Sequence, residues 1–167
     1  MYPTPGKALT ILRNIGPAMD PLEPSAAKSA LRERMRRTRA AIPVQARQAK
    51  SERVAENLFG IPAMEGAVTV LLFYSFGSEI PTSAMVDRLL GSARRVLLPY
   101  LDEGGMEAAQ LGEDRLLAAT TYGPREPSER VAVDPAEIDV VVTPGLAFDS
   151  EGHRLGYGAA GGGRRAQ

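Results

Sequence analysis

Two basic residues near the start of a predicted helix have the spacing of a phosphate-binding pair. Lys28 and Arg32 are four positions apart, so a helix places them on one face. They fall in its first turns, where unpaired backbone N–H groups favour anions, and a polyphosphate would suit that end. The other cations of this helix are interpreted as a solvated basic surface: Arg34, Arg36, Arg37 and Arg39.

A second candidate for ligand binding is the segment 74–79, which follows a strongly apolar stretch. Ligands of open α/β sheets bind where buried strands end in such loops. Tyr74 or Phe76 could stack on a flat heterocycle, and Glu79 could accept hydrogen bonds from ring N–H groups. Composition alone favours a simpler interpretation, in which the aromatic side chains fill the core and the glutamate is solvated.

The third candidate is the glycine-rich segment 144–158, which follows the apolar run Ile138–Val142. Gly156–Gly161 matches the GxGxxG pattern of dinucleotide-binding loops. However, that fingerprint joins a strand directly to a helix and has an acidic residue ~20 positions later, so we interpret the match as coincidental. Asp149 is interpreted as a turn former and His153 as a solvent-facing loop residue.

The elements that must position these residues alternate between apolar strands and amphipathic helices. Helices are predicted at 25–41, with Ser25 as N-cap and Arg32, Arg36 and Arg39 on one face, and at 44–59 and 81–90. Strands are predicted at 67–73, 95–99 and 138–143, with a weaker one at 106–111; segments 74–80 and 122–127 are predicted loops. This order predicts an α/β fold, a three-layer sandwich with helices on both faces of a mostly parallel sheet.

Composition excludes several classes of protein. The 167 residues suit one domain, 25–158, and the equal numbers of acidic and basic residues, 20 each, argue against a general nucleic-acid binder, as does an aromatic fraction of 5%. The absence of cysteine excludes disulfides and thiolate sites. There is no membrane-spanning run and no secretory signal, so we expect a cytoplasmic protein, and a monomer. Five prolines in residues 1–24 predict a disordered extension, and translation could start at Met1 or Met19.

Taken together, five segments resemble the 5-formyltetrahydrofolate cyclo-ligase (methenyltetrahydrofolate synthetase) family and occur in the family's order. They are Lys28–Met35, Tyr74–Val86, Arg95–Leu101, Tyr122–Pro127 and Ile138–Gly158, of which the last is the most specific. The resemblance implies an enzyme that uses ATP and Mg²⁺ to convert 5-formyltetrahydrofolate to 5,10-methenyltetrahydrofolate. The formyl oxygen would be phosphorylated, N10 would attack the activated carbon, and phosphate would leave.

The resemblance also implies roles for individual residues. The residues that would bind ATP are Lys28, Arg32, Arg154, Gly156, Tyr157 and Gly158. Arg32 would also lie near the folate, Tyr74 would line the pterin site, and Glu79 would hydrogen-bond the pterin. The partners implied are small molecules, with no nucleic acid or membrane.

The segment 159–167 departs from the family pattern. It contains only glycine, alanine, arginine and glutamine, and the aspartate that the family uses for magnesium falls on Gly163. This composition is typical of GC-rich DNA translated out of frame, and a sequence error or a true truncation fits equally. We therefore expect C-terminal elements of the fold to be missing. A catalytically inactive fragment, with at most weak nucleotide or folate binding, remains the alternative function, because magnesium needs hard oxygen ligands that this tail lacks.

Overall fold

The computed structural model describes residues 24–103, 105–112, 114–120 and 123–158. They belong to two compact units: Pro43–Thr143, and a smaller unit made of residues 24–42 together with 144–158. The predicted extension before Pro24 and the aberrant tail 159–167 lie outside the described residues. None of the described helices is long and apolar enough to cross a membrane.

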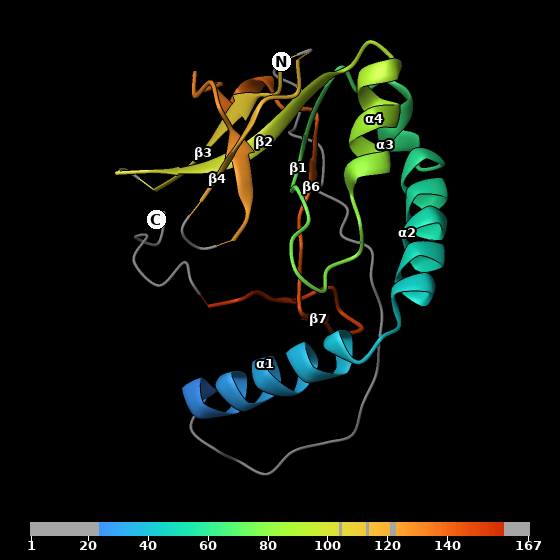
Figure 1. Cartoon of the computed structure of the whole chain (residues 1–167), viewed down its shortest axis with the longest axis vertical. Coiled ribbons are helices and arrows are strands. Elements are labelled where there is room, and N and C mark those ends of the chain that lie inside the picture. Colours follow the sequence, from blue (N-terminus) through green and yellow to red (C-terminus); the bar gives the residue numbers. More distant parts are fainter. Residues whose placement is uncertain (1–23, 104, 113, 121–122, 159–167) are drawn as a thin grey trace, which may run out of the picture. The chain divides into compact units, whose positions relative to one another are not determined.

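The larger unit is built on a four-stranded mixed sheet with the order β3-β2-β1-β6 (Figure 1). Strand β1 pairs in parallel with both β2 and β6, whereas β3 runs antiparallel to β2. The strand bounds are β1 Thr69–Leu72, β2 Arg95–Asp102, β3 Gly105–Gln110 and β6 Val140–Val142. The predicted α/β class with a mostly parallel sheet is confirmed, and each apolar run chosen from the sequence contains a strand of this sheet.

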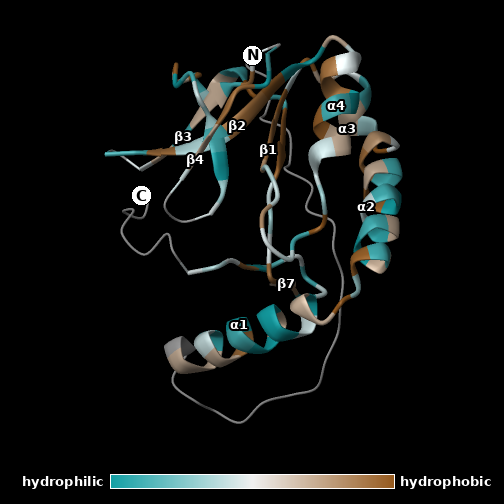
Figure 2. Cartoon of the chain, viewed as in Figure 1, coloured by the Kyte–Doolittle hydropathy of each residue, from teal (hydrophilic) through white to brown (hydrophobic). Residues whose placement is uncertain are grey.

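Alternate side chains of the central strands enter two separate cores. Val70 and Leu72 of β1 pack on one face with Val96 and Leu98 of β2, and all four are 0% or 1% exposed. The helices that cover this face are α2 (Val44–Phe59), α3 (Pro62–Glu65) and α4 (Ser83–Gly91). Figure 2 shows β1 and most of β2 as hydrophobic, as expected for central strands that are buried on both faces.

A chain segment with a short 3₁₀ turn covers the opposite face. Leu71 and Leu97 pack there against Val133 and Ile138, which flank the 3₁₀ turn η1 (Pro135–Glu137). A separate hairpin of β4 (Leu117–Ala119) and β5 (Arg125–Pro127) completes the unit. The prediction that 122–127 is all loop was therefore wrong, because a three-residue strand is too short to give a periodic signal.

The smaller unit contains α1 (Pro24–Ala40) and a hairpin of β7 (Ala147–Phe148) and β8 (Arg154–Leu155). The helix already includes Ser25, so this residue is not its N-cap. The hairpin lies within the segment that was expected to be a loop. Its turn is organised by Asp149, whose Oδ1 accepts hydrogen bonds from the N–H groups of Glu151 and His153, both at 2.9 Å. The turn-forming role predicted for Asp149 is confirmed.

Asp139 joins the beginnings of two neighbouring strands, β1 and β6. Its Oδ2 accepts from the N–H groups of Val68 and Thr69 at 2.9 and 2.8 Å, and its own N–H donates to the Thr69 carbonyl at 3.0 Å. The backbone donors of Thr69 and Val68 lower the pKa of this carboxyl below 3.8, outweighing a small opposing effect of burial.

We expect Asp139→Ala to lower the free energy of unfolding by about 1 kcal/mol, the scale of a charge-assisted bond near the surface. Because the folded pKa is depressed, the stabilisation is present above about pH 4 and is lost as the pH falls through the folded pKa. Denaturant melts from pH 2.5 to 7 test this. The loss should shrink towards acid pH, and Asp139→Asn, which keeps an acceptor but does not titrate, should show a flatter profile than the wild type. Equal losses at every pH would contradict the assignment.

Candidate functional site

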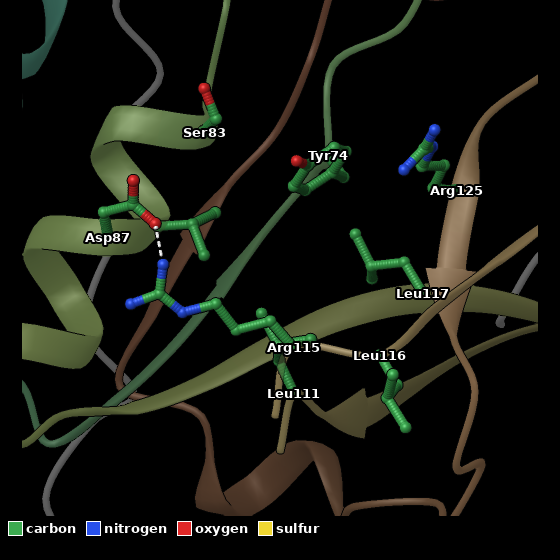
Figure 3. Close-up of a pocket in the computed structure, with 9 residues that line it drawn as sticks. Tyr74, Ser83, Asp87, Leu111, Arg115, Leu116, Leu117 and Arg125 are labelled. Carbon is green, nitrogen blue, oxygen red and sulfur yellow. Dashed lines mark hydrogen bonds and ion pairs between the residues drawn. The ribbon is translucent and has the colours of Figure 1, made fainter. Parts of the chain in front are cut away.

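A cavity of about 400 Å³ lies in the larger unit, at the end of the sheet where the chain leaves β1 (Figure 3). Tyr74 is two residues beyond the end of the strand and points into it. The other lining residues come from α4 and from the segments around the β4–β5 hairpin: Ser83, Val86, Asp87, Leu111, Arg115, Leu116, Leu117 and Arg125. The cavity therefore occupies the position where sheets of this class bind ligands.

The lining of the cavity combines an apolar wall with two arginines of different character. Leu111 and Leu117 are partly or fully buried and contribute to the core that packs against Tyr74. Arg115 is paired with Asp87, its Nη1 lying 2.6 Å from the carboxylate Oδ1. Arg125 makes no side-chain hydrogen bond or ion pair within the described part of the chain. It is the guanidinium available to an anionic group in the cavity.

The loop that carries Tyr74 is held closed by side chain to backbone hydrogen bonds. Ser75 and Thr82 exchange them reciprocally: the Ser75 N–H donates to Thr82 Oγ1 at 2.9 Å, and the Thr82 N–H donates to Ser75 Oγ at 3.1 Å. The hydroxyl of buried Ser51, on α2, donates to the carbonyl of Pro81. These bonds fix both ends of the loop, so Tyr74 is presented from a defined backbone.

Glu79 is buried in this loop, with 6% of its surface exposed. Its Oε2 accepts from the N–H of Phe76 at 3.0 Å, and its own N–H donates to the Phe76 carbonyl at 3.2 Å. The compositional interpretation of Glu79 as a solvated residue was therefore wrong. Glu79 does not line the cavity, although it belongs to the same loop as Tyr74. Whether it binds a pterin stays a prediction.

In the smaller unit, four of the six residues predicted to bind ATP come together. Arg32, from α1, donates from Nε to the Gly156 carbonyl at 3.0 Å. Gly158 has a φ of +84°, and a Cβ at this position would lie 3.2 Å from the Arg32 guanidinium carbon. The turn Gly156–Gly158 is therefore packed closely against Arg32, which only glycine allows at position 158.

The other two predicted residues lie near this cluster in sequence but not in it. Lys28 is exposed, one helical turn before Arg32. Arg154, on β8, donates from Nη1 to the Pro144 carbonyl at 2.8 Å and so braces the base of the hairpin. Its Nη1 would also lie 3.9 Å from a Cβ built on Gly156, so Arg154 borders the turn without a hydrogen bond to it.

Two arginines that the sequence did not single out complete the cluster. Arg36 donates from Nη2 to the Tyr157 carbonyl at 3.1 Å, and Arg39 donates to the Tyr157 hydroxyl. Their guanidinium carbons lie 6.0 and 5.3 Å from the centre of the Tyr157 ring. The interpretation as a solvated surface was wrong for Arg39, which is half-buried, whereas Arg36 is exposed as expected and also bonds the turn. Their shared face with Arg32 was visible in the sequence, but their partner, more than 100 positions later, was not.

The described residues do not offer a set of magnesium ligands. Among them no group of three or more His, Cys, Asp or Glu side chains could hold a metal. The two carboxylates that precede the turn at 156–158 most closely in sequence are those of Glu151, which is exposed, and Asp149. Asp149 already accepts hydrogen bonds from its own turn and lies 2.9 Å from the His153 ring nitrogen. Position 163, where the family pattern has an aspartate, lies outside the described residues.

Comparisons with known proteins agree on one family. Residues 24–164 match the model described as the 5-formyltetrahydrofolate cyclo-ligase family. The 5-formyltetrahydrofolate cyclo-ligase of Mycolicibacterium smegmatis is 35% identical over 139 residues, covering 79% of this chain and 71% of the relative. That of Escherichia coli K12 is 29% identical, covering 74% and 71%. The NMR structure of Aquifex aeolicus 5,10-methenyltetrahydrofolate synthetase superposes with a TM-score of 0.71 at 28% identity, covering 78% of this chain and 67% of that one.

We expect Gly158→Ala to loosen the turn at 156–158, because alanine at a φ of +84° is strained by about 1 kcal/mol and its methyl group would press on Arg32. The ¹⁵N NMR order parameters of the amides at 157 and 158 should fall. Gly152→Ala is the matched control, since Gly152 has a φ of +89° but nothing within 4 Å of an added Cβ. Equal order parameters at 157 and 158 in both variants would contradict the close packing on Arg32.

Proposed function

The chain belongs to the 5-formyltetrahydrofolate cyclo-ligase family, and we propose that it catalyses the ATP-dependent conversion of 5-formyltetrahydrofolate to 5,10-methenyltetrahydrofolate. The observation that carries this proposal is the extent of the family match. It spans residues 24–164 and so includes both the cavity beside Tyr74 and the arginine-held turn at 156–158. The cavity suits a flat ring system, and the basic turn suits a polyanion.

The proposed reaction has two steps. The oxygen of the N5-formyl group attacks the γ-phosphorus of ATP. A new O–P bond forms, and the bond between the γ-phosphorus and the bridging oxygen breaks, so ADP leaves. N10 then attacks the formyl carbon with its lone pair and loses its proton, and the C–O bond breaks with phosphate as the leaving group. One ATP is consumed for each methenyl group formed. Such chemistry is accelerated mainly by positioning the reactants and neutralising charge.

The smaller unit has the positive charges and backbone donors that suit a nucleoside triphosphate. Lys28 and Arg32 place two positive charges one helical turn apart, and the neighbouring turn contributes backbone N–H groups. Cations and N–H donors that are fixed before the reaction stabilise charge on a transferring phosphoryl group more effectively than mobile water does. We assign the ATP phosphates to Lys28, Arg32 and the turn Gly156–Gly158, with Arg154 bracing the hairpin that leads into it.

The cavity of the larger unit supplies the chemistry that a folate needs. A volume of about 400 Å³ lies within the range of small-molecule sites, ~300–1,000 Å³. The ring of Tyr74 offers a stacking surface for the pterin, and Leu117 extends the apolar wall. The unpaired guanidinium of Arg125 suits a carboxylate of the glutamate tail. Glu79 is proposed to accept hydrogen bonds from the pterin N–H groups.

The remaining features of the proposal are less specific. We propose that magnesium accompanies ATP, as it does in most phosphoryl transfers, without assigning its ligands. We also propose that residues 25–158 act as one functional domain, monomeric and cytoplasmic, on small molecules alone. The zero net charge supports the absence of a nucleic-acid partner.

The direct test is turnover by the purified 167-residue chain. With 5-formyltetrahydrofolate, ATP and Mg²⁺, we expect the absorbance of methenyltetrahydrofolate to rise in step with ADP, and omission of ATP to abolish both. Binding of either substrate without any product would instead establish the alternative, an inactive fragment. If the chain shows neither substrate binding nor turnover, the proposed function is rejected.

For the folate site, we expect Tyr74→Ala to weaken 5-formyltetrahydrofolate binding by about 10-fold, the scale of one lost stacking contact. Tyr74→Phe is the matched control and should bind normally, because it keeps the ring. Glu79→Gln should raise the folate Kd far more than the ATP Kd, since glutamine still offers an oxygen to the Phe76 N–H and so preserves the loop. Calorimetric titration with each substrate measures these values. An unaltered folate Kd in Glu79→Gln would restrict Glu79 to a structural role.

For the nucleotide site, we expect Arg32→Ala to raise the ATP Kd by at least about 10-fold, because it removes both a phosphate ligand and the donor to the Gly156 carbonyl. Arg34→Ala is the control. It removes the same charge from the same helix at an exposed position with no side-chain partner within the described residues. Equal effects of the two substitutions would show that Arg32 acts only through overall charge.

A further inference from the structure

Three arginines of α1 form a ladder along one helix face and hold successive groups of a single turn. Arg32, Arg36 and Arg39 are spaced by four and three positions. Arg32 bonds the Gly156 carbonyl, Arg36 bonds the Tyr157 carbonyl, and Arg39 bonds the Tyr157 hydroxyl. The order of the donors along the helix follows the order of the acceptors along the turn, from the backbone outwards to the end of the Tyr157 side chain.

The ladder determines which way the peptide groups of the turn face. No cis peptide bond occurs in the described residues, so each carbonyl and the following N–H point in opposite directions. Because the carbonyls of Gly156 and Tyr157 point to the guanidinium groups of Arg32 and Arg36, the N–H groups of Tyr157 and Gly158 point away from those two guanidinium groups. Two consecutive N–H groups that face the same side form an anion-binding concavity.

The Tyr157 side chain anchors this arrangement. Its ring lies beneath two guanidinium groups, at 5.3 Å for Arg39 and 6.0 Å for Arg36, within the range of cation–π attraction. The residues on either side are glycines, which offer no side chain with which to hold the turn. Without the anchor, ligand binding would have to order a flexible glycine segment, at an entropic cost.

We propose that Arg36 and Arg39 are positioning residues that pre-organise the Gly156–Gly158 turn, so that the N–H groups of Tyr157 and Gly158 are aimed at the phosphates of ATP. They act through Tyr157 and do not themselves touch the nucleotide. The inference rests on the proposed function for the identity of the ligand. The orientation of the turn is independent of it and can be measured without ATP.

The competing explanation is that these arginines supply only positive charge near a polyanion. Arg37 separates the two explanations, because it lies beside Arg36 on the same helix but is exposed and, among the described residues, pairs only with Glu33, at 3.6 Å. Arg37→Ala removes the same charge as Arg36→Ala from almost the same place. It leaves the ladder intact.

The experiment combines backbone ¹⁵N NMR relaxation of the free protein with calorimetric binding of ATP and 5-formyltetrahydrofolate. In Arg36→Ala and Arg39→Ala we expect the order parameters of the 157 and 158 amides to fall from about 0.85, the value of rigid backbone, to below about 0.6. The ATP Kd should rise about 5- to 20-fold, while the folate Kd stays within two-fold of the wild type, which also verifies that the variants are folded. Arg37→Ala should change none of these values.

Tyr157→Phe adds a test of the pathway, since it removes the hydroxyl that accepts from Arg39 and keeps the ring. If Arg39 acts through Tyr157, the double variant should raise the ATP Kd by less than the product of the fold-changes caused by Arg39→Ala and Tyr157→Phe alone. Unchanged order parameters at 157 and 158 in Arg36→Ala and Arg39→Ala would overturn the inference, as would an equal loss of ATP affinity in Arg37→Ala. A wild-type chain with a rigid turn that binds no ATP would instead reject the proposed function and, with it, the nucleotide role of the turn.

Discussion

The burial of β1 between two parallel neighbours is the constraint from which the larger unit is built. Val70 and Leu72 are fully buried on the helix-covered face, and Leu71 packs into the opposite core, so the strand can neither slip nor turn over without exposing apolar surface. Parallel pairing on both sides leaves the carboxyl end of β1 free to enter a loop. The reciprocal Ser75 and Thr82 bonds close that loop, and Tyr74 consequently faces the cavity.

In the smaller unit the main constraint is the ordering of the turn at 156–158, in which two of the three residues are glycines. Gly156 and Gly158 allow close backbone approach but would otherwise be conformationally free. Guanidinium donors from α1 supply the order by occupying carbonyl oxygens in sequence. The same basic helix therefore provides both the charge for a polyanion and the scaffold for the turn that meets it.

Strands that coincide with long apolar runs were predicted well from the sequence. Short hairpins and side chains whose partners lie far away in the chain were predicted badly. The strands of the sheet were identifiable because β1, β2 and β6 are rich in β-branched and leucine residues. The hairpins β4–β5 and β7–β8 were missed because strands of two or three residues carry no period. Glu79 was taken as solvated because its partner is a backbone N–H. Arg39 was taken as a surface charge because its acceptor, Tyr157, lies 118 positions away.

The central claim is that this chain uses ATP to activate the formyl oxygen of 5-formyltetrahydrofolate. The most direct measurement follows that oxygen. The substrate is labelled with ¹⁸O in the formyl group, turned over with ATP by the purified chain, and the inorganic phosphate is analysed by mass spectrometry. The account predicts one ¹⁸O atom in the phosphate for each methenyl group formed. Methenyl product accompanied by unlabelled phosphate, or no product at all, would contradict it.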